Sequence, residues 1–312
     1  MNILISAANS DISTAIARIM QLNYPEASLV GVAPDGLWPG NHFYKNIESV
    51  PFIGPDNEYI IRINNIIKKY DIDLFIPISE KELAFFASPD APKVDVDMLI
   101  NPKEVIETCL DKYKTYLWLK EIGISVPETY LFNDQKSFEW PVVVKPRKSA
   151  GSKNIFTAKN KIFLNAIRQE YSDIIDQYII QRQISDATQE YTCALWRQKN
   201  DFRFLILHRK LQGGLTSEAK VVRNISIEDT LNKIQKNIFG DFFINVQLRL
   251  ENGVPYVFEI NPRFSSTVIM RHKIGFQDLV WSINAKLHLS ISSYSGTKTG
   301  TQIYRLSDEL IV

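Results

Sequence analysis

Four polar residues in the last third of the chain have types and spacing that suit a site for a metal ion and a triphosphate. Gln247 lies in one strand-like segment, Glu259 and Asn261 lie in a second, and an Asn-Gly turn signal separates the two segments. Alternate side chains of a strand share a face, so a hairpin can bring these three oxygen-bearing groups together. Carboxylate and amide oxygens are the ligands that a hard ion such as Mg²⁺ prefers. Arg263 follows closely, and a guanidinium suits the γ-phosphate, whose charge spreads during phosphoryl transfer.

The alternation also predicts how the rest of this hairpin is oriented. Val257 is expected to share the polar face with Glu259 and Asn261, and the opposite face is expected to be apolar, formed by Val246, Leu248, Phe258 and Ile260. Each polar residue taken alone is more typical of a solvated strand face. The whole string Glu-Ile-Asn-Pro-Arg, placed behind a strand that carries Gln247, favours the metal and phosphate site.

Two strings of this hairpin resemble the C-terminal signature of the ATP-grasp superfamily. They are Asn245-Val246-Gln247 and Phe258-Glu259-Ile260-Asn261-Pro262-Arg263, and they are most similar to the branch of the carbamoyl-phosphate synthase large subunit and biotin carboxylase. The resemblance implies that Gln247, Glu259 and Asn261 bind magnesium. It also implies that Arg263 meets the transferring phosphoryl group and that Asn261 and Lys145 act with it in catalysis.

Upstream segments resemble the same family in the same order, over roughly residues 105–270. Lys112 follows an Asp at a helix start, as does the family's basic residue that reaches the ATP phosphates, and Lys145 resembles its phosphate-binding strand lysine. The loop with Ser149, Gly151 and Ser152 resembles the phosphate flap, although the family often has more glycines there. The adenine hinge is expected at Gln181, Arg182, Gln183 and Ile184, and the ribose-binding carboxylate at Glu190. Arg182 departs from the pattern, because many members have a Glu near the hinge.

The resemblance implies an ATP-dependent carboxylate–amine ligase. A small-molecule carboxylate would take the γ-phosphoryl group to form an acylphosphate, and an amine would then displace phosphate to form an amide, releasing ADP. ATP and Mg²⁺ would be the cofactors, with two ions that Mn²⁺ can replace. Two alternatives stay open: an acceptor other than an amine, and an ATP-binding regulatory module without turnover. Residues that can bind the carboxylate substrate, if they are not surface polar residues, are Arg203, Ser265, Ser266 and Arg271. His208 and Arg209 lie on the same segment as Arg203 and could face the same cleft.

The elements that must position these residues predict a mixed architecture of α/β and α+β type. Strands and helices alternate over residues 1–100, which predicts a doubly wound parallel sheet before the two-lobed ATP-grasp fold. The turn after the first strand lacks a GxGxxG fingerprint, so we do not expect a dinucleotide site. Asn101 is expected to cap a helix that runs on toward Gly123. The expected domains are 1–100 (N-terminal α/β), 101–183 (N-terminal lobe with the flap) and 184–312 (C-terminal lobe with the metal site).

Composition limits the other possibilities. The 312 residues carry 36 Lys and Arg against 35 Asp and Glu, a net charge of +1, which gives no field for binding nucleic acid or an acidic membrane. Cys109 and Cys193 are isolated and predict neither a disulfide nor a structural zinc site. We see no signal peptide and no apolar run long enough to span a membrane, so we expect a cytoplasmic protein. A homodimer is possible, since dimers are common in such families.

Overall fold

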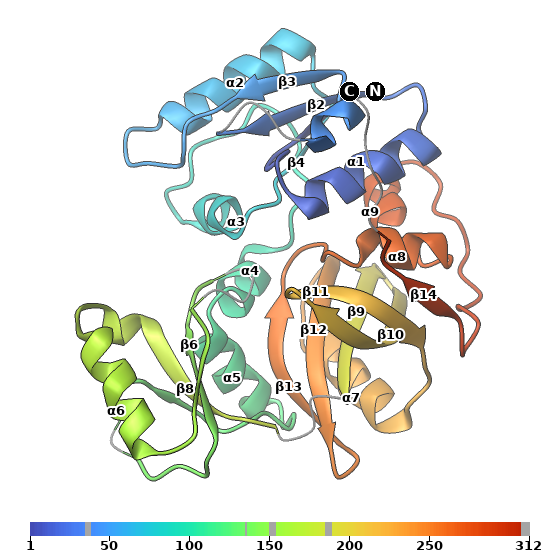
Figure 1. The fold of residues 1–312 in the computed structure, drawn as a ribbon. Coiled ribbons are helices and arrows are strands. Elements are labelled where there is room, and N and C mark those ends of the chain that lie inside the picture. Colours follow the sequence, from blue (N-terminus) through green and yellow to red (C-terminus); the bar gives the residue numbers. More distant parts are fainter. Residues whose placement is uncertain (35–38, 135, 150–153, 185–188, 307–312) are drawn as a thin grey trace.

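The N-terminal part of the chain is a parallel sheet in the order β3-β2-β1-β4 (Figure 1). The structure, a computed structural model, describes residues 1–34, 39–134, 136–149, 154–184 and 189–306. The strands of this sheet are β1 (Asn2–Ile5), β2 (Ser28–Ala33), β3 (Asn46–Ser49) and β4 (Leu74–Ile76). The connecting helices are α1 (Asp11–Asn23), the 3-10 helix η1 (Pro39–Phe43), α2 (Glu58–Tyr70) and α3 (Glu80–Ala87).

Helices cover both faces of this sheet because its central strands are apolar on both sides. Ile3 and Ile5 of β1 pack in the cluster that contains α1, whereas Leu4 packs in the cluster that contains α2. This confirms the predicted doubly wound arrangement, in which a buried parallel strand reads as a continuous apolar run.

The carboxyl ends of β1 and β4 form a rigid polar edge. The carboxylate of Glu82, which is 4% exposed, accepts from Ser6 Oγ at 2.7 Å, from the Ser79 backbone N at 3.0 Å and from Tyr59 OH. Ser79 caps α3 in return, so Glu82 and Ser79 form a capping box. The strand order changes direction at β1, because the chain adds β2 and β3 on one side of β1 and then β4 on the other. This is the kind of switch point at which doubly wound sheets leave a crevice. Helix α3 therefore begins at this edge with Glu80 held in a fixed place.

The middle of the chain forms an antiparallel sheet in the order β5-β8-β6-β7. Its strands are β5 (Thr129–Leu131), β6 (Val142–Pro146), β7 (Phe156–Ala158) and β8 (Tyr178–Arg182), with α6 (Lys161–Glu170) and the 3-10 helix η2 (Ser172–Gln177) between the last two. A single helix was expected before this sheet, but the structure has two, α4 (Lys103–Cys109) and α5 (Lys112–Glu121). The helix is interrupted because Asp111 leaves the helical conformation to cap α5.

Asn101 does not cap α4, which corrects the sequence-based expectation. Pro102 occupies the N-cap position, and the Asn101 amide instead donates to the carbonyls of Phe243 at 2.8 Å and Pro262 at 2.9 Å. Its own oxygen accepts from the Phe243 backbone N at 2.9 Å. Asn101 thus ties the start of α4 to the two strands of the C-terminal hairpin.

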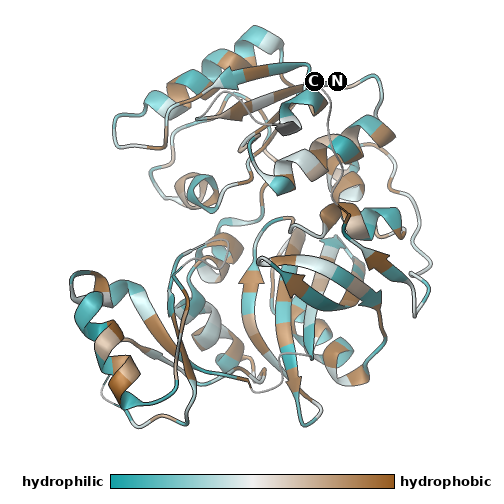
Figure 2. Ribbon diagram, viewed as in Figure 1, coloured by the Kyte–Doolittle hydropathy of each residue, from teal (hydrophilic) through white to brown (hydrophobic). Residues whose placement is uncertain are grey.

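The C-terminal part of the chain is a curved antiparallel sheet in the order β13-β12-β9-β10-β11-β14 (Figure 1). Its strands are β9 (Glu190–Gln198), β10 (Asp201–Gln212), β11 (Leu215–Val221), β12 (Phe242–Glu251), β13 (Val254–Asn261) and β14 (Gln302–Tyr304). Its helices are α7 (Ile225–Lys236), α8 (Val268–Lys273) and α9 (Asp278–Lys286). Hydrophilic and hydrophobic bands alternate along β12 (Figure 2), where Val246 and Leu248 are buried in the cluster that also contains α7.

A β-bulge at Phe258 changes the predicted facing of β13. Gln247 pairs with Glu259, but the next residue, Leu248, pairs with Val257, so Phe258 has no partner of its own. Val257 is consequently buried with Leu248 in the apolar cluster, and Phe258 turns to the polar face, where it contacts Lys145. The predicted faces of Val257 and Phe258 were therefore wrong, while those of Gln247, Glu259 and Asn261 are correct.

No helix in the described ranges is both long and apolar enough to cross a membrane.

Candidate active site

The core of the site is the pairing of Gln247 with Glu259 across β12 and β13, with Asn245 opposite Asn261 in the same ladder. Asn261 is 6% exposed, and the Asn245 side-chain oxygen accepts from Thr192 Oγ1 at 2.8 Å. The Asn245 Nδ2 is buried without a hydrogen-bond partner in the structure. A buried amide donor without a partner is costly unless a ligand satisfies it.

Lys112 brings a buried positive charge to Glu259. Its Nζ lies 3.9 Å from Glu259 Oε1 and donates to the Ser149 carbonyl at 3.0 Å. The position of Lys112 follows from Asp111, which caps α5 and is itself held by Arg147 at 2.7 Å. Hydrogen bonds and the guanidinium of Arg147 hold the pKa of Asp111 below its usual range, against the opposing effect of burial. Lys112, the predicted phosphate-binding lysine, is thus fixed beside Glu259 and beside Ser149, the first residue of the predicted flap.

Lys145 lies at the end of β6 and is 6% exposed. Its Nζ donates to Gln181 Oε1 at 2.8 Å and to the Phe258 carbonyl at 3.5 Å. Burial lowers the pKa of Lys145 to about 8, with Glu259 acting in the opposite direction and Lys112 adding to the lowering. A buried cation with only neutral hydrogen-bond partners is stabilised when an anion enters.

The predicted adenine hinge is split by strand alternation. Gln181 points into the site, where its amide donates to Thr129 Oγ1 at 2.9 Å. Arg182 points the other way, pairing with Glu251 at 2.9 Å and stacking over Tyr256, so its charge is engaged away from the hinge. Beyond it, Gln183 has a buried Oε1 with no hydrogen-bond partner among the described residues, and the Ile184 carbonyl accepts from Arg249 at 3.2 Å. The predicted flap residues Gly151 and Ser152 lie outside the described residues.

Glu190 is held between two arginines. Its Oε1 accepts from Arg209 at 2.6 and 3.1 Å, and its Oε2 accepts from Arg249 at 2.7 and 2.9 Å. The same Arg209 Nη2 donates to Gln247 Oε1 at 2.9 Å. Both oxygens of Glu190 therefore already have partners in the structure, and its contact with a ribose stays a prediction.

Arg263 forms an ion pair with Glu80, the first residue of α3. Its Nη2 donates to Glu80 Oε1 at 2.8 Å, and its Nη1 donates to the Phe264 carbonyl at 3.2 Å. Both side chains of the ion pair are about 15% exposed, 14% for Arg263 and 15% for Glu80. The pair places the predicted phosphoryl-binding arginine at the edge where β1 and β4 end.

Two of the predicted substrate residues are structural. Arg271 is 1% exposed and forms an ion pair with Asp278 at 2.6 Å, and its remaining donors bind Ser265 and Thr267. Arg203 is paired with Asp201 at 2.5 Å, and its guanidinium lies over the rings of Trp196 and Trp281. Neither guanidinium is available to a substrate, so their expected role is not supported.

Ser265 and Ser266 sit in the loop behind Arg263. Ser265 Oγ is 2.8 Å from Thr267 Oγ1 and accepts from Arg271, which places it in the structural network. The Ser266 carbonyl accepts from Arg305 at 2.6 Å. Only Ser266, which is partly exposed, keeps its side chain as a candidate for substrate contact.

The donor set fits a hard divalent ion that is shared with a polyphosphate. Within the described ranges no group of three or more His, Cys, Asp and Glu side chains could hold a metal. The hairpin offers one carboxylate, Glu259, and the amide oxygens of Gln247 and Asn261. Mg²⁺ binds in this way, through few protein ligands, several waters and the phosphates of the substrate.

Strand alternation could have assigned one further residue to the site, and the position of a second, which the sequence analysis considered as facing the cleft, could not be fixed. Arg249 lies two residues after Gln247 and so shares its face. Arg209 reaches the site only through the pairing of β10 with β9, whose register the sequence does not reveal. Glu80 carried a weak signal, since it follows a parallel strand and ligands gather at such edges.

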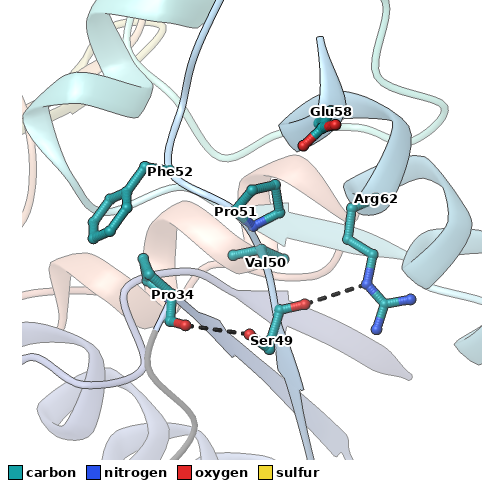
Figure 3. A pocket seen from close by; sticks show the side chains of 7 residues that line it. All are labelled: Pro34, Ser49, Val50, Pro51, Phe52, Glu58 and Arg62. Atoms are coloured by element: carbon teal, nitrogen blue, oxygen red, sulfur yellow. Dashed lines mark hydrogen bonds between the residues drawn. The ribbon is translucent and has the colours of Figure 1, made fainter. Parts of the chain in front are cut away.

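A separate hollow of about 440 Å³ lies on the N-terminal sheet and shares no residue with this site (Figure 3). Phe52 and Pro51 form its apolar wall, and Arg62 donates to the Ser49 carbonyl at 3.2 Å. The Arg62 charge is paired with Glu48 at 2.5 Å. No side chain in this hollow is arranged for chemistry.

The comparison with protein families agrees with the geometry. The model of the ATP-grasp domain matches residues 109–267, which is half of the chain. The chain belongs to the ATP-grasp family. The matched span begins just before Lys112 and ends just after Arg263, so it contains Lys112, Lys145, Glu190, Gln247, Glu259, Asn261 and Arg263.

Known proteins of the family place the fold more closely. A D-alanine–D-alanine ligase of Petrotoga mobilis is 28% identical over 185 residues, covering 50% of this chain and 58% of the ligase. The N5-carboxyaminoimidazole synthetase of Staphylococcus aureus complexed with ADP superposes with a TM-score of 0.71 at 16% identity, covering 93% of this chain and 78% of that one. The biotin carboxylase domain of the Hydrogenobacter thermophilus 2-oxoglutarate carboxylase gives 0.71 at 12% identity, with coverages of 96% and 73%.

The family match confirms the predicted ATP-grasp family, and the superposed structures confirm the predicted fold. The chain spans only 32% to 58% of the length of the curated relatives that it matches.

Proposed function

We propose that the protein is an ATP-dependent carboxylate–amine ligase that forms an amide through an acylphosphate and releases ADP and phosphate. The observation that carries this proposal is the facing pair Gln247–Glu259 with Lys112 at 3.9 Å from the Glu259 carboxylate. This places oxygen ligands and a buried cation at one point, as the transfer of a charged phosphoryl group requires. Adenine binding alone would need neither.

The residues take separate roles along the bound nucleotide. Lys145 and Lys112 hold the phosphates, and Gln247, Glu259 and Asn261 supply the protein oxygens for Mg²⁺. An ion held by these residues would supply charge neutralisation at the phosphates. Arg263 donates to the phosphoryl group as its charge spreads in transfer.

The acceptor is expected at the carboxyl edge of the N-terminal sheet. Arg263 reaches that edge through its ion pair with Glu80, which begins α3 directly after the Ser79 cap. A carboxylate substrate that binds there meets Arg263 on one side and the γ-phosphate on the other. Glu80 offers a negative group that can bind an ammonium or amine donor. A matched relative named D-alanine–D-alanine ligase supports a substrate with both groups.

The first test is ADP release with ATP and Mg²⁺ across a panel of carboxylates, each assayed with and without amines. The variant Glu259→Ala should lower ADP release at least about 1,000-fold, because an interaction used in the transition state is lost. The matched control is Glu218→Ala, which removes a carboxylate of β11 that is ion-paired with Lys210 at 2.8 Å, outside the site. Release that needs one acid and one amine supports the ligase. Full activity in Glu259→Ala contradicts the site, and tight MgATP binding without release from any acid supports an ATP-binding module.

A further inference from the structure

One contact in the structure competes with the proposed metal role of Gln247. Arg209 Nη2 donates to Gln247 Oε1 at 2.9 Å, and this is the atom with which a glutamine side chain binds a divalent ion. An amide oxygen that holds a guanidinium cannot bind Mg²⁺ on the same side, since two cations would then lie in contact. The arginine is not loosely placed, because its side chain is 9% exposed and its partner Glu190 is 6% exposed.

The charges around this contact favour the binding of an anion. Arg209 and Arg249 bring two positive charges to a single carboxylate, Glu190, and to the neutral amide of Gln247. This group of side chains therefore carries one positive charge in excess, beside the buried cations Lys112 and Lys145. Buried charges without a partner are unfavourable, so an anion is expected to bind here, and a polyphosphate has the required charge.

We infer that Arg209 is a positioning residue that exchanges partners when the metal binds. In the structure it holds Gln247 Oε1 while it is bonded to Glu190. With a metal ion on Gln247 Oε1, Arg209 would give up this contact and keep its bonds to Glu190. The inference rests on the proposed function, because it assumes that this site binds MgATP.

The consequence is a measurable coupling between metal and nucleotide. Isothermal calorimetry gives the dissociation constant of ATP in EDTA and in excess Mg²⁺, and the ratio of the two is the coupling factor. In Arg209→Met the metal no longer has to break the contact with Gln247, while metal-free ATP loses a cation. A hydrogen bond to a charged group is worth enough to change the ratio by about tenfold or more, so we expect the ratio to rise by at least that factor.

Arg249→Met is the matched control. Arg249 has the same charge and donates to the same carboxylate, but the structure gives it no bond to Gln247. It lies directly opposite Glu190 on β12. Loss of one charge alone weakens metal-free ATP more than MgATP, so we expect the ratio to rise in this variant by no more than about threefold. The difference between the two variants isolates the contact with Gln247.

Each outcome decides the inference. A larger rise in Arg209→Met than in Arg249→Met supports it, whereas equal changes, or no rise in Arg209→Met, overturn it. If Arg209→Met fails to fold, Arg209→Lys replaces it: one ammonium cannot bridge Glu190 and Gln247 as the guanidinium fork does, so an intermediate rise is expected and a wild-type ratio contradicts the inference. If the wild-type protein does not bind MgATP at all, the proposed function fails; if it binds MgATP and the ratios disagree, only the inference fails.

Discussion

Replacing Lys145 by Met should stabilise the fold at neutral pH while it weakens nucleotide binding. Lys145 is 6% exposed, and its described hydrogen-bond acceptors, Gln181 and the Phe258 carbonyl, are neutral. Burial lowers its pKa to about 8 from the ordinary 10.5. The charged lysine is thus retained at a cost to stability, which is expected of a residue that serves a ligand.

The size and the sign of the effect follow from this pKa. A depression of about 2.5 pKa units corresponds to about 3 kcal/mol of destabilisation wherever the lysine is protonated in both states, below pH 8. Between pH 8 and 10.5 the unfolded chain binds the extra proton, so this penalty disappears as the pH rises. Met also leaves Gln181 Oε1 without its donor, at a cost of about 1 to 2 kcal/mol. The net result is a gain of about 1 to 2 kcal/mol at pH 7 that becomes a loss of similar size near pH 10.5.

Urea unfolding of both proteins at pH 7 and at pH 10 measures this difference, provided that their m-values agree. Lys114→Met, which removes an exposed lysine from α5, is the control for the loss of one surface charge. The reasoning is refuted if Lys145→Met is less stable than the wild type at pH 7, or if the difference between them is the same at both pH values. Calorimetry measures the affinity for MgATP, which should be at least about tenfold weaker in Lys145→Met than in the wild type.

The other predictions concern two ion pairs, Arg263–Glu80 and Arg271–Asp278. Glu80→Gln removes the charged partner of Arg263 and should lower kcat by about tenfold or more with little change in the KM for ATP, because the phosphoryl-binding group loses its position; a higher KM with unchanged kcat would assign Glu80 to binding instead. Arg271→Met leaves the buried carboxylate of Asp278 without its partner and should destabilise the fold by about 3 to 5 kcal/mol in urea unfolding. A loss below about 1 kcal/mol would show that Arg271 is not the structural residue described above.

The parts of the site that the sequence predicted are those set by local periodicity. Gln247 shares its face with Asn245 because β12 alternates regularly against a buried apolar side, and the pattern of that strand is fully visible in the sequence. The same rule was wrong for Val257 and Phe258, because one bulged residue reverses the facing of everything before it on β13. No residue type near Phe258 predicts the bulge from the sequence.

Contacts between distant segments were beyond the sequence for a different reason. The bond from Arg209 to Gln247 depends on the register of β9 with both β10 and β12, and one-residue changes of register would move Arg209 to the other face. Asn101 has the residue type and spacing of a helix cap, and only the approach of β12 shows that its amide is used elsewhere. Arg271 was expected to be accessible, because a fully buried arginine is rare unless a carboxylate such as Asp278 pairs with it.

The described contacts suggest why such a site can be stable and still bind its ligands. Three of the proposed ligand groups already hold a partner of the opposite or complementary kind: Glu259 has Lys112, Gln247 has Arg209, and Arg263 has Glu80. Each of these groups therefore has a partner in the structure, and this limits the free-energy cost of burying it. Binding of a metal and a triphosphate must then exchange partners rather than only add contacts, and its net affinity is the difference between two sets of interactions. Since each native partner carries its own charge, a ligand that supplies only the anion or only the cation would leave one member of each pair unmatched. This favours the metal–nucleotide complex over either component alone.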